Sequence, residues 1–346
     1  MKPPICCRKV DAVLSHAHED HFNGFKLLYD NACKNVFENG YIPWFAMSDL
    51  DALGGILIKY SLLLYRYYSD SSIIAAHAKH WLLAAPVMAS VCKKLWCVCA
   101  GDQVRSWDVP NKILWPPRPS QGQPQPSQGH EDELQKKWSA YLDKNGLPDN
   151  FLSDEAEEIQ AILKRFYGTS PGNPQRDELS SEKVDQAITT INTVLTRNES
   201  RAEFSALKWS SPRHLYYKKY KPSIDNHSLI FEIGEPGNDG LFLSDAHDQT
   251  IKKMLTLNTL NDKQYKFIKS GHHGNRGAKE LLAHNVSGDV VVNCCGPASS
   301  NWKGPDDNYL RVSKEVVVCL DWNNNSKKWQ NKKGYFHPQE CYFRIP

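Results

Sequence analysis

Residues 15–21 read Ser-His-Ala-His-Glu-Asp-His, and they follow directly on the apolar run Val10–Leu14. Such a run predicts a short buried strand, so the polar residues after it are expected in a loop at its end. The loop concentrates three imidazoles and a carboxylate, those of His16, His18, Asp20 and His21. Imidazole nitrogens and carboxylate oxygens are ligands of zinc and its first-row neighbours. The run therefore predicts a metal site, and the competing interpretation is a polar loop that happens to be histidine-rich.

Two later stretches also end a predicted strand with metal-binding side chains. Residues 240–245, Gly-Leu-Phe-Leu-Ser-Asp, form an apolar strand that ends in Asp245. Residues 266–274, Lys-Phe-Ile-Lys-Ser-Gly-His-His-Gly, form another that ends in His272 and His273. Each stretch is a weak signal alone, and their order after the first motif makes them informative.

The first motif, His-x-His-x-Asp-His followed by Phe22-Asn-Gly24, resembles the signature of the metallo-β-lactamase superfamily. The His-His-Gly loop and the stretches 226–230 and 109–117 look most similar to the ComEC competence-protein branch of that superfamily. The resemblance covers about residues 9–30, 95–118 and 224–346. Alternating strands and helices predict a layered α/β fold. The resemblance implies that this fold is an αββα sandwich with the metals at one edge.

The resemblance also implies a dinuclear centre with two divalent metal ions, zinc first, with manganese or iron as alternatives. Two such metals hold a bridging hydroxide that attacks phosphorus or a carbonyl carbon. The implied ligands are His16 and His18 for one metal, Asp20 and His21 for the other, Asp245 as the bridge, and His272 with His273 as its competitor. The expected catalytic residues are Asp20, Asp245 and Asn226.

The third ligand of the first metal is not evident from the motifs. By strand position it should lie near residues 224–226, where Asp225 could ligate and Asn226 could orient the substrate. Three other histidines are weaker candidates: His214, His227 and His247. His77 and His80 lie in an apolar, helical stretch and are interpreted as core or surface residues.

One departure from the family concerns the N-terminal strands, which are shortened here because only about fourteen residues precede the first motif. Either the chain lacks part of one sheet, or another segment or subunit completes it. This departure motivates an alternative to catalysis, a binding or assembly subunit that keeps the fold. A further alternative is a β-lactamase or another ester or amide hydrolase.

Composition shifts divide the chain into four parts. Residues 1–118 and 206–346 are the predicted halves of the hydrolase domain, 119–130 are a Pro/Gln-rich linker, and 131–205 are a helical insertion. Residues 131–200 hold 8 Lys and Arg against 14 Asp and Glu, whereas the remainder holds 34 against 25. An acidic, solvated insertion suits a lid or a surface for a protein partner, and a basic remainder suits an anionic substrate.

Residues 208–221 mix lysines, arginine and aromatic residues, a pattern that can follow a phosphate backbone while stacking on bases. The predicted substrate contacts are Lys218, Lys219, Tyr220 and Lys269, and Lys263 and Lys266 could add positive potential beside the His-His-Gly loop. The alternative interpretation is that residues 208–221 form an ordinary solvent-exposed surface with no substrate contact. With these motifs, the sequence predicts a phosphodiesterase or nuclease.

No signal peptide is evident, and the apolar stretch 52–68 is interrupted by Lys59 and Arg66, which predicts a core helix rather than a membrane span. The ten cysteines form no disulfide pattern and are expected to be reduced, mostly buried thiols. A cytoplasmic protein is therefore expected.

Overall fold

A computed structural model describes residues 10–68, 72–104, 109–118, 128–168, 171, 180–197, 212–295, 306–320 and 335–336. Most of the predicted linker and a strand predicted at 342–345 lie outside these ranges. The chain forms two compact units, one from residues 1–99 and 117–224, the other from residues 100–116 and 225–346. Both contain helices and strands, so the predicted α/β class is confirmed. The predicted boundaries of the insertion and of the hydrolase halves stay predictions.

The first unit contains a sheet of three parallel strands, β1 (Ala12–Val13), β2 (Phe37–Pro43) and β3 (Cys92–Val98), in the order β1-β2-β3. The apolar pattern of residues 41–90 predicts a mostly helical stretch, and this prediction is wrong at its start, where Tyr41 to Pro43 belong to β2. A buried parallel strand lacks the alternating pattern of a half-exposed one. Its Asn39-Gly40 pair and Pro43 are also residues that strands usually disfavour.

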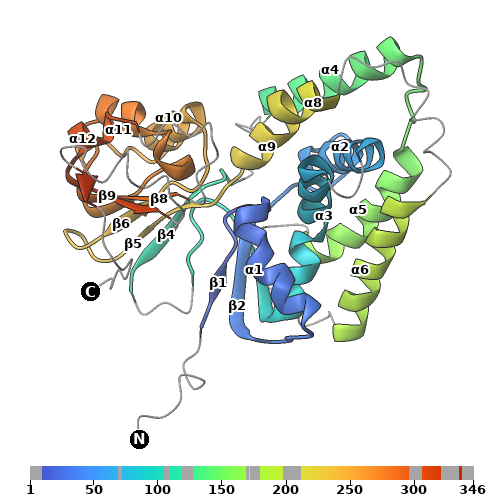
Figure 1. Cartoon of the computed structure of the whole chain (residues 1–346), viewed down its shortest axis with the longest axis horizontal. Helices are drawn as coiled ribbons and strands as arrows, with labels where there is room; N and C mark the ends of the chain where they lie inside the picture. Colours follow the sequence, from blue (N-terminus) through green and yellow to red (C-terminus); the bar gives the residue numbers. More distant parts are fainter. Residues whose placement is uncertain are drawn as a thin grey trace, which may run out of the picture. The chain divides into compact units, whose positions relative to one another are not determined.

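The other elements in the described part of the first unit are helices (Figure 1). Their bounds are α1 (Glu19–Asp30), α2 (Leu53–Tyr67), α3 (Ile73–Val91), α4 (Gln128–Asn145), α5 (Ser153–Tyr167), α6 (Ser181–Thr196), α8 (Pro212–Leu215), the π-helical η3 (Tyr216–Tyr220) and α9 (Lys221–Asp225). Helix α2 is buried on every side from Leu53 to Arg66, as expected for a helix that is apolar all round. The buried faces of α4, α5 and α6 belong to the same hydrophobic core as α2 and α3.

A buried arginine ties three of these helices together. Arg66 of α2 pairs through Nη1 with Glu155 Oε1 of α5 at 3.0 Å, and its Nη2 donates to the carbonyl of Val194 in α6 at 3.1 Å. Because the Arg66 side chain is only 1% exposed, its charge depends on these two acceptors.

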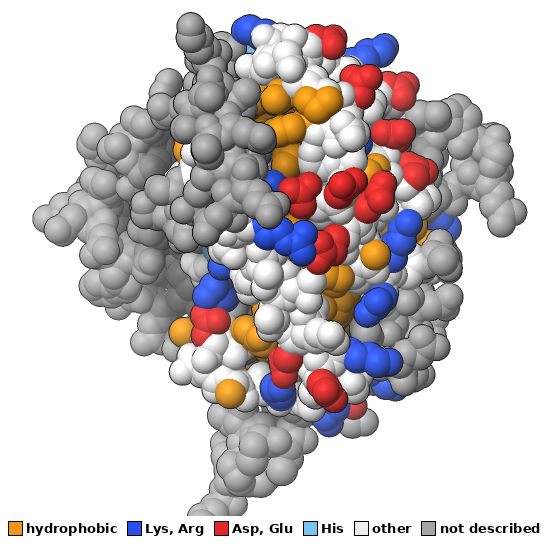
Figure 2. All heavy atoms as spheres, turned by 90° about the vertical axis from the view of Figure 1, so that its right-hand side faces the viewer, with side chains coloured by type: hydrophobic (Ala, Val, Ile, Leu, Met, Phe, Trp, Pro, Cys, Tyr) orange, Lys and Arg blue, Asp and Glu red, His pale blue; other side chains and the backbone are white. Residues whose placement is uncertain are grey.

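The outer face of the first unit carries the acidic surface that the sequence predicts. Asp154 and Glu157 of α5 and Glu182 of α6 are exposed. Figure 2 shows acidic side chains gathered on this side of the molecule, with Lys and Arg side chains between them. A mixed surface of this kind remains solvated, which explains why these helices are apolar only along their inner faces.

The second unit is built on a seven-stranded sheet in the order β10-β9-β8-β7-β6-β5-β4. Its strands are β4 (Asn111–Trp115), β5 (Ile230–Ile233), β6 (Gly240–Phe242), β7 (Gln264–Lys269), β8 (Ser287–Cys295), β9 (Ser313–Leu320) and β10 (Tyr335–Phe336). β5 pairs antiparallel with both β4 and β6, whereas the pairs from β6 to β10 are parallel. Helices α10 (Asp248–Leu257), α11 (Ala278–Ala283) and α12 (Tyr309–Val312) share one core with the sheet (Figure 1).

None of the described helices is long and apolar enough to cross a membrane. Among the cysteines that the structure describes in full, Cys92, Cys97 and Cys99 are buried and belong to no disulfide, so their predicted burial is confirmed, whereas Cys33 is half-buried. Burial raises the pKa of the Cys97 thiol, so this group stays protonated and packs as an apolar residue.

Two glycine substitutions should move stability in opposite directions. A Cβ on Gly55 of α2 would lie 2.5 Å from the carbonyl oxygen of Asp49 and from the Cα of Leu50, so Gly55→Ala should destabilise the fold by about 1–3 kcal/mol. A Cβ on Gly24 of α1 meets nothing within 4 Å, so Gly24→Ala should stabilise it by about 0.5–1 kcal/mol. Urea unfolding of both variants measures the difference, and equal shifts would contradict the close approach at Gly55.

Candidate functional site

The first motif leaves β1 and enters α1 within a few residues. His18 occupies the N-cap position of α1 with an extended backbone, and its side chain makes no capping hydrogen bond. The imidazoles of His16 and His18 are buried, and that of His21 is half-buried. The strand end and the helix start thus gather the three motif histidines in one place.

The three imidazoles lie against one another. The ring of His16 is 4.6 Å from that of His18, edge-on, and 4.1 Å from that of His21. His18 and His21 each offer a ring nitrogen within 4.8 Å of one from His16. This spacing fits ligands of a metal ion, since zinc–nitrogen bonds of about 2 Å put neighbouring ligand atoms 3–4 Å apart after small adjustments. We call these three residues the histidine cluster.

A serine that precedes the motif connects two of these rings. Ser15 Oγ lies 3.1 Å from His16 Nδ1 and 3.2 Å from His21 Nδ1. One hydroxyl oxygen can accept from both rings. If each Nδ1 carries the proton, each ring presents Nε2 to a metal, which is the usual arrangement of a ligand histidine and its outer partner. Sequence analysis missed this role, although Ser15 adjoins the motif.

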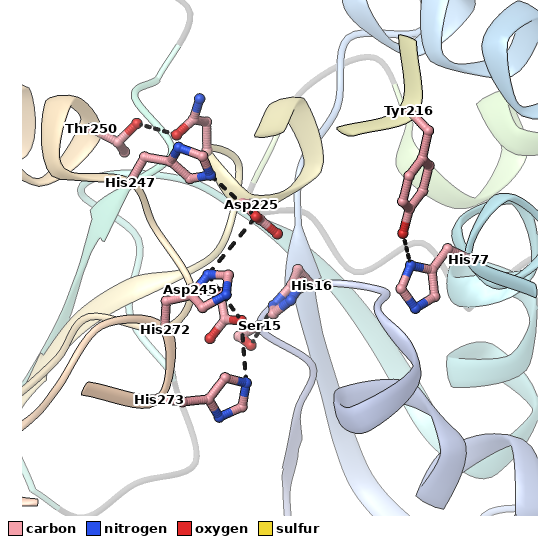
Figure 3. A network of polar contacts seen from close by, with 11 residues as sticks. Ser15, His16, His77, Tyr216, Asp225, Asp245, His247, Thr250, His272 and His273 are labelled. Carbon is pink, nitrogen blue, oxygen red and sulfur yellow. Dashed lines mark hydrogen bonds and ion pairs between the residues drawn. The ribbon is translucent and has the colours of Figure 1, made fainter. Parts of the chain in front are cut away.

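A second pair of residues lies behind the histidine cluster. His77 of α3 stacks on His18 with ring centres 4.8 Å apart and an interplanar angle of 23°. Its Nδ1 is hydrogen-bonded to the hydroxyl of Tyr216, which belongs to η3 (Figure 3). Both side chains are buried. His77 is therefore a core residue, as interpreted from the sequence, but it also touches a predicted metal ligand.

His80, one helical turn after His77, should make stability depend on pH. Burial, followed by the charges of Lys26 and Lys79 and by His18, lowers the pKa of His80 from 6.5 to about 4. Between these two values the unfolded chain binds a proton that the folded protein excludes, so stability falls as the pH falls through this window. His80→Leu should make the urea-unfolding free energy less dependent on pH between about 6.5 and 4. Parallel pH profiles for the two proteins would contradict a neutral, buried His80.

In the second unit, Asp245 follows the end of β6 and is buried. The residue before it, Ser244, has a left-handed backbone with φ of 49°, and its hydroxyl donates to the carbonyl of Leu229. The bend turns the chain out of the strand, which presents the Asp245 carboxylate at the strand end.

The His-His-Gly loop holds two histidines in an unusual backbone conformation. His272 and His273 have φ of 43° and 56°, both in the left-handed region that residues other than glycine rarely adopt. Hydrogen bonds fix the loop, among them His272 N–H to the carbonyl of Ser244 at 2.9 Å. His272 Nδ1 lies 3.7 Å and His273 Nε2 3.9 Å from Asp245 Oδ2 (Figure 3). The strained backbone thus aims both rings at one carboxylate.

Asp225 joins the same group of side chains. Its Oδ2 is 3.2 Å from His247 Nε2 and 4.0 Å from His272 Nδ1, and the residue is buried. His247, only a weak candidate by sequence, is therefore a direct partner of Asp225. We call Asp225, Asp245, His247, His272 and His273 the carboxylate cluster.

The other predicted site residues have mixed outcomes. Asn226 is tied to the fold, because its Oδ1 accepts from Thr250 Oγ1 at 2.7 Å and its carbonyl accepts from Trp115 Nε1 at 2.5 Å. The backbone of Asp20 lies in α1, while its side chain is outside the described part of the structure. His214 is exposed and His227 is buried.

The predicted substrate contacts need correction at Tyr220. Its ring is fully buried, and its hydroxyl is 2.8 Å from Ser61 Oγ, so it cannot stack on a base. Lys219 pairs with Glu133, and Lys218 is exposed. Residues 208–211 lie outside the described ranges.

The lysines that were expected near the His-His-Gly loop are partly neutralised. Lys263 pairs with Glu232 at 2.6 Å and with Asp239 at 3.1 Å, and Lys266 pairs with Asp289 at 3.1 Å. Hydrogen bonds from Lys266, Lys314 and Gln264 lower the pKa of Asp289. Lys269, at the end of β7, is half-buried. Of these lysines, Lys269 therefore remains the best candidate for contact with an anion.

Both clusters have the donor chemistry of a zinc site. The histidine cluster supplies imidazoles only, and the carboxylate cluster supplies two buried carboxylates with imidazoles at 3.2–4.0 Å. Such donors suit zinc, manganese and iron. No family model, curated protein or solved structure matches this chain.

Proposed function

We propose that this protein is a metal-dependent hydrolase that cleaves phosphodiesters, with nucleic acid as the substrate class. The observation that carries the proposal is the histidine cluster, three neighbouring imidazoles at a strand end of which two are buried. Burying several imidazoles together serves packing poorly, because each ring must satisfy two polar nitrogens. Metal binding accounts for their proximity.

The proposed fold is the αββα sandwich of the metallo-β-lactamase superfamily, which the resemblance of the motifs implies. The proposed ligand assignment is the one that the resemblance implies. His16 and His18 would bind one metal and Asp20 and His21 the other, with Asp245 shared and His272 completing the set. Asp225 is the proposed third ligand of the first metal.

When bound, two such metals supply a hydroxide at neutral pH and stabilise negative charge that develops on a phosphoryl oxygen. The protein's own groups hold the ligands. Ser15 would fix the tautomers of His16 and His21, and His247 would orient the Asp225 carboxylate. Lys269 would contact the anionic substrate.

An anionic substrate is proposed because positive charge is concentrated outside the acidic segment. Residues outside 131–200 carry 34 Lys and Arg against 25 Asp and Glu. Such an excess favours binding of polyanions through long-range attraction. A β-lactam carries a single carboxylate and would gain less from this excess than a polyanion, which is why we rank β-lactamase activity second.

The test is metal analysis of protein purified without chelator, combined with a substrate screen. Mass spectrometry should find two zinc or manganese ions per chain, and the loaded protein should cleave single-stranded DNA, RNA or a bis-aryl phosphate. Turnover of a β-lactam alone would reassign the substrate. One metal or none, with every substrate intact, would overturn the proposal and favour a binding or assembly subunit.

A further inference from the structure

Behind the histidine cluster, a chain of aromatic contacts runs through the core of the first unit. It begins at His18, continues through His77 to Tyr216, and passes on to Tyr220 and Ser61. These residues come from the start of α1, from α3, from η3 and from α2. All five are buried. The arrangement therefore links one proposed ligand to three separate helices.

Both tyrosines lie on the π-helical turn η3. The Lys221 N–H bonds to the carbonyl of Tyr216, five residues back, instead of the four of an α-helix. Tyr216 and Tyr220, four residues apart, lie on the same side of this turn, with ring centres 6.1 Å apart. Single π turns cost stability and occur often at functional sites. Here the turn brings the Tyr216 hydroxyl to His77.

The other end of the turn is anchored independently of the histidines. The Tyr220 hydroxyl is 2.8 Å from Ser61 Oγ, which donates to the Leu57 carbonyl within α2 at 2.8 Å. Burial raises the pKa of Tyr220, so its hydroxyl stays neutral and serves only as a hydrogen-bonding group. Because α2 is buried on every side, its position is fixed by packing, and the hydrogen bond to Ser61 therefore holds Tyr220 in place.

We propose that His77 and Tyr216 are positioning residues for His18, an inference that rests on the proposed function. Tyr216 fixes the plane of the His77 ring through Nδ1, and His77 covers one face of His18 at 4.8 Å. His16 meets His18 edge-on, so rotation of the His18 ring is restricted by both neighbours. A ring held in this way presents its ligand nitrogen in a single direction. His77 and Tyr216 thus act on the metal through His18.

Tyr216→Phe is the sharpest test, because it removes only the hydroxyl that holds His77. Zinc affinity, measured by competition with a chromophoric chelator, should fall by up to about 10-fold, the lower end of the effect of losing a direct outer partner of a ligand, because Tyr216 acts on His18 through His77. The matched control is Tyr60→Phe. It also removes a buried hydroxyl, one that donates to the Leu134 carbonyl at 3.2 Å in the same unit. Its zinc affinity should equal that of the wild type.

Cobalt substitution gives a readout that simple destabilisation would not change. The visible absorption bands of bound Co²⁺ report ligand geometry, so they should shift in Tyr216→Phe and stay unchanged in Tyr60→Phe. His77→Phe keeps a flat ring beside His18 but loses the bond to Tyr216. If the pair acts as one unit, the double variant should lose no more zinc affinity than the weaker-binding single variant.

Each outcome separates this inference from the proposed function. Wild-type protein that binds neither zinc, manganese nor iron would refute the proposed function itself. Wild-type protein that binds zinc, with unchanged affinity and cobalt spectrum in Tyr216→Phe, would overturn the positioning role alone. Equal losses in Tyr216→Phe and Tyr60→Phe would also overturn it, because they would show a general effect on the core.

Discussion

Asp245→Ala should remove metal-dependent phosphodiester cleavage and lower the metal content of the purified protein. Asp245 is buried, and two imidazole nitrogens lie within 3.9 Å of its Oδ2. In the proposed centre it is the carboxylate that both metals share, so its loss affects both ions at once. Losing an outer partner of a ligand already costs about 10–100-fold, so losing this ligand should cost more than about 100-fold in activity.

The matched control for this prediction is Asp289→Ala. Asp289 is also a carboxylate of the second unit, but it forms surface pairs with Lys266 and Lys314. Its replacement should leave the metal content and the activity unchanged, because surface ion pairs contribute little. Metal analysis and initial rates on a bis-aryl phosphate measure both variants. Full metal content in Asp245→Ala would show that Asp245 is not a ligand.

Glu155→Ala should destabilise the first unit more than the removal of a carboxylate from an exposed ion pair of the same unit. It leaves the Arg66 guanidinium, 1% exposed, without its carboxylate. Removing one partner of a buried pair typically costs about 3–5 kcal/mol. Because Glu155 itself is 26% exposed, water can compensate in part, and we expect about 3 kcal/mol.

Glu158→Ala on the same helix is the matched control. Glu158 Oε2 pairs with Arg197 Nη1 at 2.7 Å, but both side chains are more than a third exposed. Its removal should cost at most about 1 kcal/mol. Urea unfolding of the two variants at neutral pH gives the comparison. Similar losses would mean that water reaches Arg66 and that α2, α5 and α6 do not depend on this pair.

Much of the secondary structure could be predicted because local patterns decide it. The residue pattern alone predicts helices at 153–166, 180–195 and 248–257, and the structure has α5, α6 and α10 at these positions to within a residue or two. Their apolar stripes have the helical period. Strand β2 was missed because buried parallel strands are recognised by their pairing partners, which the local sequence does not reveal.

In the candidate site, contacts between residues close in the sequence could be predicted, and contacts between residues far apart in the sequence could not. Short spacing brings His16, His18 and His21 together, and the motif predicts this directly. The contacts of His77 with Tyr216 and of His247 with Asp225 join residues 139 and 22 positions apart. No spacing rule connects such residues. The prediction of Tyr220 as a substrate contact was wrong for a related reason. A run of basic and aromatic residues does not show which of its rings face the core.

The two units are nested along the chain, and this affects how the protein can be made. Strand β4 pairs with β5 through Asn111 and Ile233, more than a hundred residues apart. At about 5–20 residues per second, a ribosome needs roughly 6–24 s to supply the partner of β4. During that interval the nascent chain carries an unpaired strand edge while the first unit is still being completed. Slower synthesis would lengthen this interval and should therefore lower the solubility of the second unit first.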